Sequence, residues 1–246
     1  MPSVSAEARP AFYALSPGSW RDYVTLLHPP YTAWHLSYVV IGAALAPQWF
    51  PGRLGAALAA FFLAVGIGAH ALDELHGRPL STRIPATVLT VLAAASIVGA
   101  VAIGIAGAVE IDPWLLVFVG VGAFIVCAYN LELFGGRFHS DVWFAVDWGA
   151  FPLLTAYFAC AGTIQVEAVL AAAFAALSSY AQRRLSSPVR RLRREVASVS
   201  GSIELDDGSR EPITRGTLIA GNEAALRAFA LGMVTLAIAL VVLRVR

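Results

Sequence analysis

The stretch "GAALAAFFLAVGIGAHALDELHGRPL", Gly55 to Leu80, joins a long apolar run to a compact polar cluster. No charged residue occurs between Gly55 and Ile67, whereas two histidines and two carboxylates fall between His70 and His76. Ionisable side chains are costly inside a lipid bilayer, so where they gather at an apolar segment they are candidates for a functional site. The stretch therefore predicts a membrane-spanning helix that ends in such a site.

The composition of the whole chain supports a membrane protein. Of the 246 residues, 58% are hydrophobic and 13% are charged, with a mean hydropathy of +0.71, whereas a soluble domain has about 25% charged residues. A helix needs about 20 apolar residues to span a bilayer, and about seven runs of that kind occur. They cover residues 32–49, 54–75, 85–108, 113–132, 142–161, 165–182 and 224–243. The predicted fold class is an all-α integral membrane protein with about seven transmembrane helices.

The apolar runs also divide the chain into parts. Residues 1–31 form an N-terminal segment in which aromatic and charged residues are mixed, as is typical of a helix lying along the membrane interface. Residues 32–182 form the transmembrane core, and residues 223–246 add a C-terminal transmembrane helix. The segment 183–222 between them is predicted to be a basic cytoplasmic loop, in which strand-like alternation around Asp207 predicts a short hairpin.

The basic residues limit the chemistry. Lysine is absent, so all 17 residues of the lysine-plus-arginine count are arginines. Schiff-base chemistry by lysine is thereby excluded, whereas arginine binds phosphate well in a forked, bidentate geometry. The two cysteines, Cys127 and Cys160, lie in apolar runs and make neither a disulfide framework nor a Cys-x-x-Cys metal site.

The arginines also indicate an orientation. When successive helices alternate in direction, the N-terminus and the loops after the second, fourth and sixth helices lie on one side. That side receives Arg9, Arg21, Arg78, Arg83, Arg137, Arg183, Arg184, Arg190, Arg191, Arg193, Arg194, Arg210 and Arg215, and the other receives Arg53, Arg244 and Arg246. Because positive charge concentrates on the cytoplasmic side, we expect a cytoplasmic N-terminus in a prokaryotic plasma membrane.

The histidines fall at or near the cytoplasmic ends of the predicted helices. They are His28, His35, His70, His76 and His139. In the opening stretch, His70 and Glu74 are four residues apart and share a helix face, and Asp73 can pair with His76. The alternative interpretation is a helix end that reaches the lipid headgroups, but the density of ionisable groups favours a site.

A second cluster lies in "YNLELFGGRFHSDVWFAVDWGAFPLL", which begins at Tyr129. Tyr129 and Glu132 share a helix face before a Gly-Gly pair breaks the helix. The following loop, which solvation alone also explains, contains Arg137, His139 and Asp141. Asp147 lies inside the fifth predicted helix, where both a structural hydrogen bond and a catalytic role are open.

The third cluster is "QRRLSSPVRRLRRE", Gln182 to Glu195, whose positive charge suits anionic lipid headgroups. A diphosphate clamp is the functional alternative. The four later arginines, Arg190, Arg191, Arg193 and Arg194, surround a helix instead of lining one face, which favours the lipid interpretation. Arg183 and Arg184 lie closer to the membrane and are the better clamp candidates.

Taken together, these motifs resemble the UbiA superfamily of intramembrane prenyltransferases over roughly residues 25–185. The similar features are "HPPYTAWHLSYVVIGAALA", "HALDELHGRPL", "AYNLELFGG" and "WGAFPLLTAYFA", in the first, second, fourth and fifth predicted helices. The resemblance implies a UbiA-like helical bundle in which acidic motifs hold magnesium on a prenyl diphosphate. Aligned on Arg78 and Pro79, the first acidic motif keeps Asp73, and Glu74 adds a carboxylate. The second acidic motif is replaced by "AQRRLSSPVRRLRRE".

The resemblance also implies roles for the candidate residues. The catalytic residues would be His70, Asp73, Tyr129 and Asp147. The substrate-binding residues would be His35, Arg78, Arg137, Arg183 and Arg184. The expected function is that of a UbiA-like membrane enzyme acting on an isoprenoid or other lipid at a cytoplasm-facing pocket, with altered handling of the metal or diphosphate.

The histidines support an alternative. Magnesium prefers oxygen ligands, whereas a mixture of imidazole and carboxylate suits iron, zinc or manganese, as in the di-iron sites of helical bundles. The ligands of such a site would be His70, Asp73, Glu74, His76, Glu132, His139 and Asp141. A third possibility is a lipid- or quinone-binding scaffold without catalysis. Membrane lipid and an isoprenoid or quinone are the expected partners, and nucleic acid is not expected.

Overall fold

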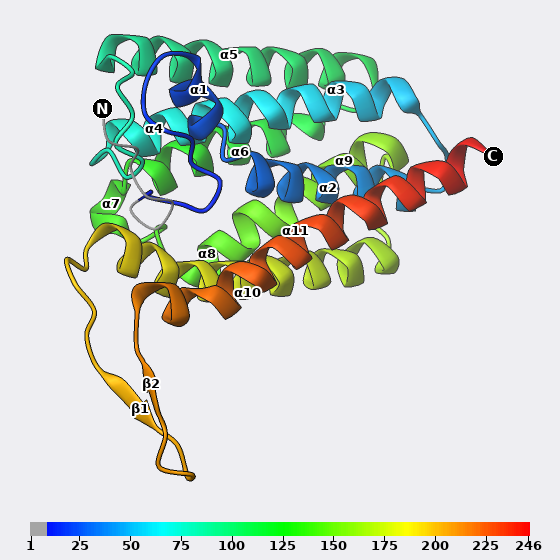
Figure 1. Cartoon of the computed structure of the whole chain (residues 1–246). Helices are drawn as coiled ribbons and strands as arrows, with labels where there is room; N and C mark the ends of the chain where they lie inside the picture. Colours follow the sequence, from blue (N-terminus) through cyan, green and yellow to red (C-terminus); the bar gives the residue numbers. More distant parts are fainter. Residues whose placement is uncertain (1–8) are drawn as a thin grey trace.

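The computed structural model describes residues 9–246 as a helical bundle from which a two-stranded hairpin projects (Figure 1). The elements in chain order are α1 (Trp20–Leu26), α2 (Pro29–Leu45), α3 (Pro51–Phe61), the π-helical segment η2 (Phe62–Ala69), α4 (His70–Leu75), α5 (Ala86–Glu110), α6 (Leu115–Asn130), α7 (Leu133–Gly136), α8 (Asp141–Ala145), the π-helical segment η3 (Val146–Ala150), α9 (Phe151–Ala161), α10 (Val166–Arg194), β1 (Ser202–Glu204), β2 (Arg210–Pro212) and α11 (Arg215–Val245). Each predicted apolar run coincides with one of these helices or with consecutive helical segments. Residues 1–8, which begin the predicted N-terminal segment, lie outside the described residues.

Length and composition identify candidate membrane spans. Within residues 9–246, four helical stretches are long and apolar enough to cross a membrane, namely Pro51–Leu75, Ala86–Glu110, Asp141–Ala161 and Arg215–Val245. Their outer faces carry large apolar side chains, and Val109 and Leu231 are 83% and 69% exposed. Contiguous apolar surface of this kind is typical of contact with lipid. The predicted all-α membrane class is therefore supported, with four candidate spans where the sequence predicted seven.

Helix α2 lies at the centre of the bundle and packs against α9 and α11 (Figure 1). A fully buried cluster of Trp34, Tyr38, Leu153 and Leu226 joins these helices. The approach of α2 to α9 is close because Gly42 has no side chain, and a Cβ atom there would overlap the backbone carbonyl of Leu153. A single glycine therefore sets the spacing at the centre of the fold.

The basic segment after the sixth apolar run is partly helical. Helix α10 continues beyond Gln182 to Arg194, so the first part of the predicted loop 183–222 belongs to a helix. The predicted hairpin is confirmed, since β1 and β2 pair antiparallel with Glu204 opposite Arg210. In the turn between them Gly208 has φ +82°, a value that suits glycine. The hairpin extends away from the bundle (Figure 1).

The arrangement of the bundle gives a testable topology. The hairpin projects from one end of the bundle and the C-terminus lies at the other (Figure 1). We expect Ser209→Cys and Arg246→Cys, each introduced after both native cysteines are replaced by serine, to react with a membrane-impermeant maleimide from opposite sides of the membrane. The measurement is labelling of intact cells and of inverted vesicles. Reaction of both positions from the same side would contradict seven crossings.

Candidate functional site

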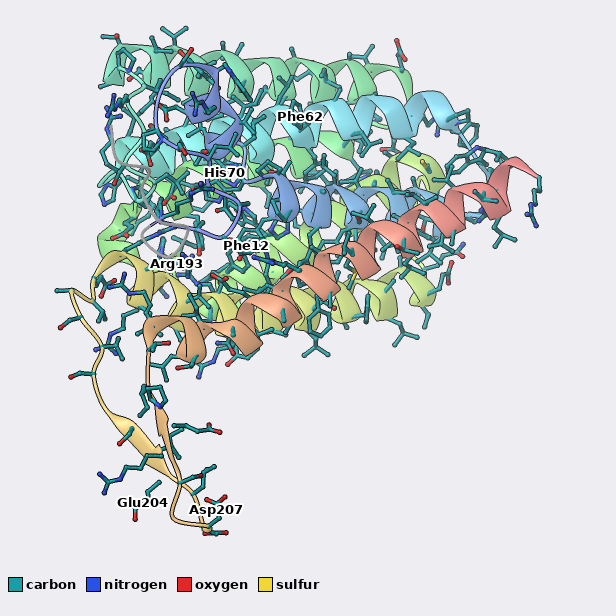
Figure 2. All side chains as sticks on the ribbon, in the orientation of Figure 1. Phe12, Phe62, His70, Arg193, Glu204 and Asp207 are labelled. Carbon is teal, nitrogen blue, oxygen red and sulfur yellow. The ribbon has the colours of Figure 1, made fainter. Side chains whose placement is uncertain are left out.

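A polar pocket lies at the end of the bundle where α4 finishes. It encloses about 100 Å³. Its polar lining consists of Tyr13, His28, Tyr31, His35, His70, Asp73, Tyr129, Asn130, His139, Gln182, Arg183, Ser186, Arg190 and Arg194. These residues come from segments far apart in the sequence, so the alternation of helices brings the predicted clusters to one end, as expected. His70 and Arg193 lie toward this end in Figure 2.

The N-terminal segment forms one wall of this pocket. Pro10 and Phe12 line it. Two arginines near the end of α10 hold the segment in place, because Arg193 Nη1 donates to the Arg9 carbonyl at 3.1 Å and Arg194 Nε to the Pro10 carbonyl at 3.3 Å. The pocket is therefore closed by the beginning of the chain.

A pair of stacked histidines lies in the pocket. The rings of His28 and His70 are parallel within 8°, with centroids 4.1 Å apart, and the hydroxyl of Tyr13 lies 2.8 Å from His28 Nδ1. Burial, with His70 beside it, holds the pKa of His28 well below its usual range, so its imidazole is neutral at pH 7. His28 was not among the predicted site residues. The "HPP" that precedes the first apolar run was the available signal.

The imidazoles of His70 and His35 are oriented by the π-helical segments. His70 Nδ1 donates to the Gly66 carbonyl in η2 at 3.1 Å, and His35 Nδ1 donates to the Trp148 carbonyl in η3 at 2.8 Å. A carbonyl oxygen only accepts, so in both rings Nδ1 carries the proton. π-Helical turns are rare and occur frequently at functional sites. Here they supply the carbonyls that orient these two histidines.

On the opposite wall, His139 positions an arginine. Its ring stacks on Tyr129 with centroids 4.4 Å apart, and its Nδ1 donates to the Tyr129 carbonyl at 3.1 Å. Its Nε2 accepts from Arg183 Nη2 at 3.2 Å, while Arg183 Nε donates to Asp141 at 3.2 Å. Both ring nitrogens thus have a hydrogen-bond partner, and His139 orients Arg183 in this arrangement.

The arginines of α10 differ from the prediction. The pocket is lined by Arg183, Arg190 and Arg194. The side chain of Arg184 is 66% exposed and contacts Asp141 outside the pocket. Burial, together with Arg183 and Arg194 nearby, lowers the pKa of Arg190 to about 10, so the guanidinium stays charged at pH 7. The later arginines, which the sequence assigned to lipid headgroups, therefore supply two of the positive charges of the pocket.

Buried polar atoms without a hydrogen-bond partner indicate that the polar pocket binds a ligand. Among the described residues, His28 Nε2, the Tyr129 hydroxyl and Gln182 Oε1 are buried without a hydrogen-bond partner, and all three residues line the polar pocket. Buried polar atoms in native proteins nearly always have a partner. Three such atoms around one cavity are therefore typical of a site that binds a polar ligand.

Two of the predicted site residues, Glu74 and Arg78, make hydrogen bonds to the loop after α4. Glu74 is fully buried, and its carboxylate accepts from Leu80 N at 2.9 Å and from Thr82 N and Oγ1 at 2.8 Å each. Arg78 donates to the carbonyls of Thr82 and Ile84. Glu74 and Arg78 therefore hold this loop, and the metal-binding role of Glu74 and the substrate-binding role of Arg78 stay predictions. Arg137 is exposed.

The remaining predicted metal ligands are spread out. Glu132 lies 3.9 Å from both His76 and His139, and the side chains of His76 and Glu132 are about half exposed. In the part of the chain that the structure describes, no three His, Cys, Asp or Glu side chains gather closely enough to hold a metal ion. The carboxylate lining the polar pocket there is that of Asp73. Two magnesium ions on a diphosphate need several carboxylates, so this donor set does not fit them.

A second, apolar cavity lies beside the polar pocket. It encloses about 350 Å³ between α3, α5, α6 and α9. Trp148 lines both cavities, so they are neighbours across one side chain. Asp147 lines the apolar cavity and not the polar pocket, although the sequence grouped it with the catalytic residues.

The geometry thus combines an arginine-rich pocket with an apolar cavity. Arg190 and Arg194, which the sequence assigned to lipid headgroups, line the polar pocket, and Glu74 and Arg78 make hydrogen bonds within the loop after α4. The resemblance to UbiA enzymes rests on the short motifs of the helices around these cavities. No protein-family model, no curated protein and no solved structure matches the chain.

Proposed function

We propose that this protein is an integral membrane enzyme, with seven crossings and a cytoplasmic N-terminus, that acts on an isoprenoid lipid bearing a phosphate or diphosphate. The observation that carries the proposal is the polar pocket, where Arg183, Arg190 and Arg194 face buried polar atoms that have no partner. Arginine binds phosphate oxygens in a bidentate geometry. The apolar cavity across Trp148 supports a role in handling lipids, because it offers space for a hydrocarbon chain beside this pocket.

The arginines suit the breaking of a bond to diphosphate. When the carbon–oxygen bond of a prenyl diphosphate breaks, negative charge builds up on the leaving diphosphate. Guanidinium groups fixed in a dry site stabilise such charge strongly. An acceptor that forms the new bond must release a proton, and Asp73, which lines the same pocket, is the candidate to receive it.

The first experiment measures binding of geranylgeranyl diphosphate to the purified protein in detergent. We expect binding to persist in EDTA, because three arginines stand where the related enzymes have a second acidic motif. Arg190→Gln should weaken it by about 30-fold, or about 2 kcal/mol, because it removes one buried charge of the site. Arg191→Gln, on the exposed face of the same helix, should change it less than about twofold.

Other outcomes would distinguish the alternatives. Binding that needs magnesium and is lost in Asp73→Asn would support diphosphate handling of the ordinary UbiA kind. Tightly bound iron, zinc or manganese that is lost in His70→Ala would support the metal enzyme. Absence of diphosphate binding by the folded protein would contradict the proposal and favour a lipid-binding scaffold.

A further inference from the structure

The apolar cavity contains a carboxyl group that the fold does not explain. Asp147 is 3% exposed, and neither of its carboxyl oxygens has a hydrogen-bond partner. An unpaired polar group in apolar surroundings costs free energy, because it loses its hydrogen bonds to water. A cavity of about 350 Å³ falls within the size range of small-molecule sites. The combination of an unpaired carboxyl and space beside it points to a ligand.

Among the other polar residues of this cavity, Arg53 and Thr155 have hydrogen-bond partners and Glu110 is exposed. Arg53 Nη1 donates to the Ala159 carbonyl at 3.0 Å, and its guanidinium lies over the ring of Phe50. Thr155 Oγ1 donates to the Phe151 carbonyl at 2.8 Å. Most of the remaining lining consists of alanine, glycine and large apolar side chains. Asp147 is thus the buried carboxyl of the described lining whose oxygens have no hydrogen-bond partner.

Neighbouring helices hold the backbone next to Asp147. A small backbone shift therefore cannot move the carboxyl group away from the cavity. The Trp148 carbonyl accepts from His35 Nδ1 at 2.8 Å. Gly149 packs so closely on α10 that a Cβ atom there would lie 2.5 Å from the Ala175 carbonyl oxygen. The residues after Asp147 are therefore fixed on two sides, by α2 and by α10, and the carboxyl is held beside the cavity.

We infer that the apolar cavity binds a lipid alcohol, with its hydroxyl on Asp147 and its hydrocarbon chain along the cavity. A protonated carboxyl offers one donor and one acceptor, and a hydroxyl offers the matching acceptor and donor, so both oxygens gain a partner. A ketone or ether supplies an acceptor alone. An ammonium would need an ionised Asp147 and would bury two charges in apolar surroundings. An anionic head would be repelled by an ionised carboxyl.

The test measures equilibrium binding of tritium-labelled farnesol to the purified protein in detergent. The wild type should bind it at one saturable site, and farnesyl methyl ether, which lacks the donor, should compete about tenfold less well. Asp147→Leu should weaken farnesol binding about tenfold, whereas Asp147→Asn, which keeps a donor and an acceptor, should stay within about threefold of wild type. Ala123→Phe should abolish binding by filling the cavity.

The stability of the variants separates binding from folding. Asp147→Leu should melt at the same or a higher temperature than the wild type, because an unpaired buried polar group is replaced by an apolar one. Asp206→Leu, which removes an exposed carboxylate of the hairpin turn, should leave farnesol binding unchanged. Equal farnesol affinity in Asp147→Leu and wild type, or no saturable farnesol binding by folded protein, would overturn the inference. Diphosphate binding at the arginines is measured separately, so either proposal can fail alone.

Discussion

Replacing Glu223 by alanine will destabilise the protein by about 1.5–3 kcal/mol, the usual contribution of a hydrogen bond to a charged group. Glu223 Oε1 lies 2.6 Å from Arg193 Nε, and the two side chains are only 10% and 6% exposed. Loss of the carboxylate removes this buried, charge-assisted hydrogen bond between α10 and α11. The measurement is the free energy of unfolding in mixed micelles, from a denaturant titration followed by tryptophan fluorescence.

The hairpin supplies a matched control for this ion pair. Arg210 Nη2 lies 3.2 Å from Glu204 Oε2, and both side chains are about two-thirds exposed, at 70% and 66%. Exposed pairs contribute about 0.2–1 kcal/mol, so Glu204→Ala should lower stability by less than about 1 kcal/mol. Equal effects of the two substitutions would mean that the Arg193–Glu223 pair is not buried in the folded protein.

Gly42→Ala will destabilise the protein by about 3 kcal/mol, at the upper end of the range for overpacked cores. The added methyl group would overlap the backbone carbonyl of Leu153, and a backbone segment cannot rotate away as a side chain can. Helices α2 and α9 must separate, which loosens the buried contacts of Trp34 and Tyr38. The effect is measured as a fall in the melting temperature of the purified protein and as the change in its free energy of unfolding from a denaturant titration.

Gly232→Ala is the control for the intrinsic effect of the substitution. Gly232 lies within α11, and a Cβ atom there meets nothing within 4 Å. Alanine in place of glycine inside a helix stabilises it by about 0.5–1 kcal/mol. The two glycine substitutions should therefore differ in sign, and a stabilising effect of Gly42→Ala would contradict the close helix crossing.

The helices were predictable because apolar runs of about 20 residues have few alternatives to a helix in a membrane. The hairpin was predictable for a local reason, since Asp207 and Gly208 form a turn between alternating segments. The hydrogen bonds of Glu74 to the loop after α4 were not predictable, for the opposite reason. Its partners, Leu80 and Thr82, lie in an irregular loop whose path depends on the packing of α4 and α5, which no local pattern encodes.

The arginine pocket shows a second limit of the sequence. The sixth predicted helix ended at residue 182, where the apolar run stops, yet α10 continues through Pro188 to Arg194. Along a continuous helix, Arg183, Arg190 and Arg194 follow the i, i+7, i+11 spacing of one face. The pattern was present in the sequence, but Arg191 and Arg193 obscured it because they lie on other faces of the same helix.

The wall that the N-terminal segment contributes to the polar pocket has a practical consequence for handling the protein. The contacts of Arg193 and Arg194 with the Arg9 and Pro10 carbonyls tie the start of the chain to the helix that carries the proposed anion-binding arginines. A tag fused to the N-terminus would join the chain on the side of that wall, whereas Arg246 lies at the far end of the bundle (Figure 1). An affinity tag therefore belongs after Arg246, at the end of the bundle away from the proposed ligand pocket.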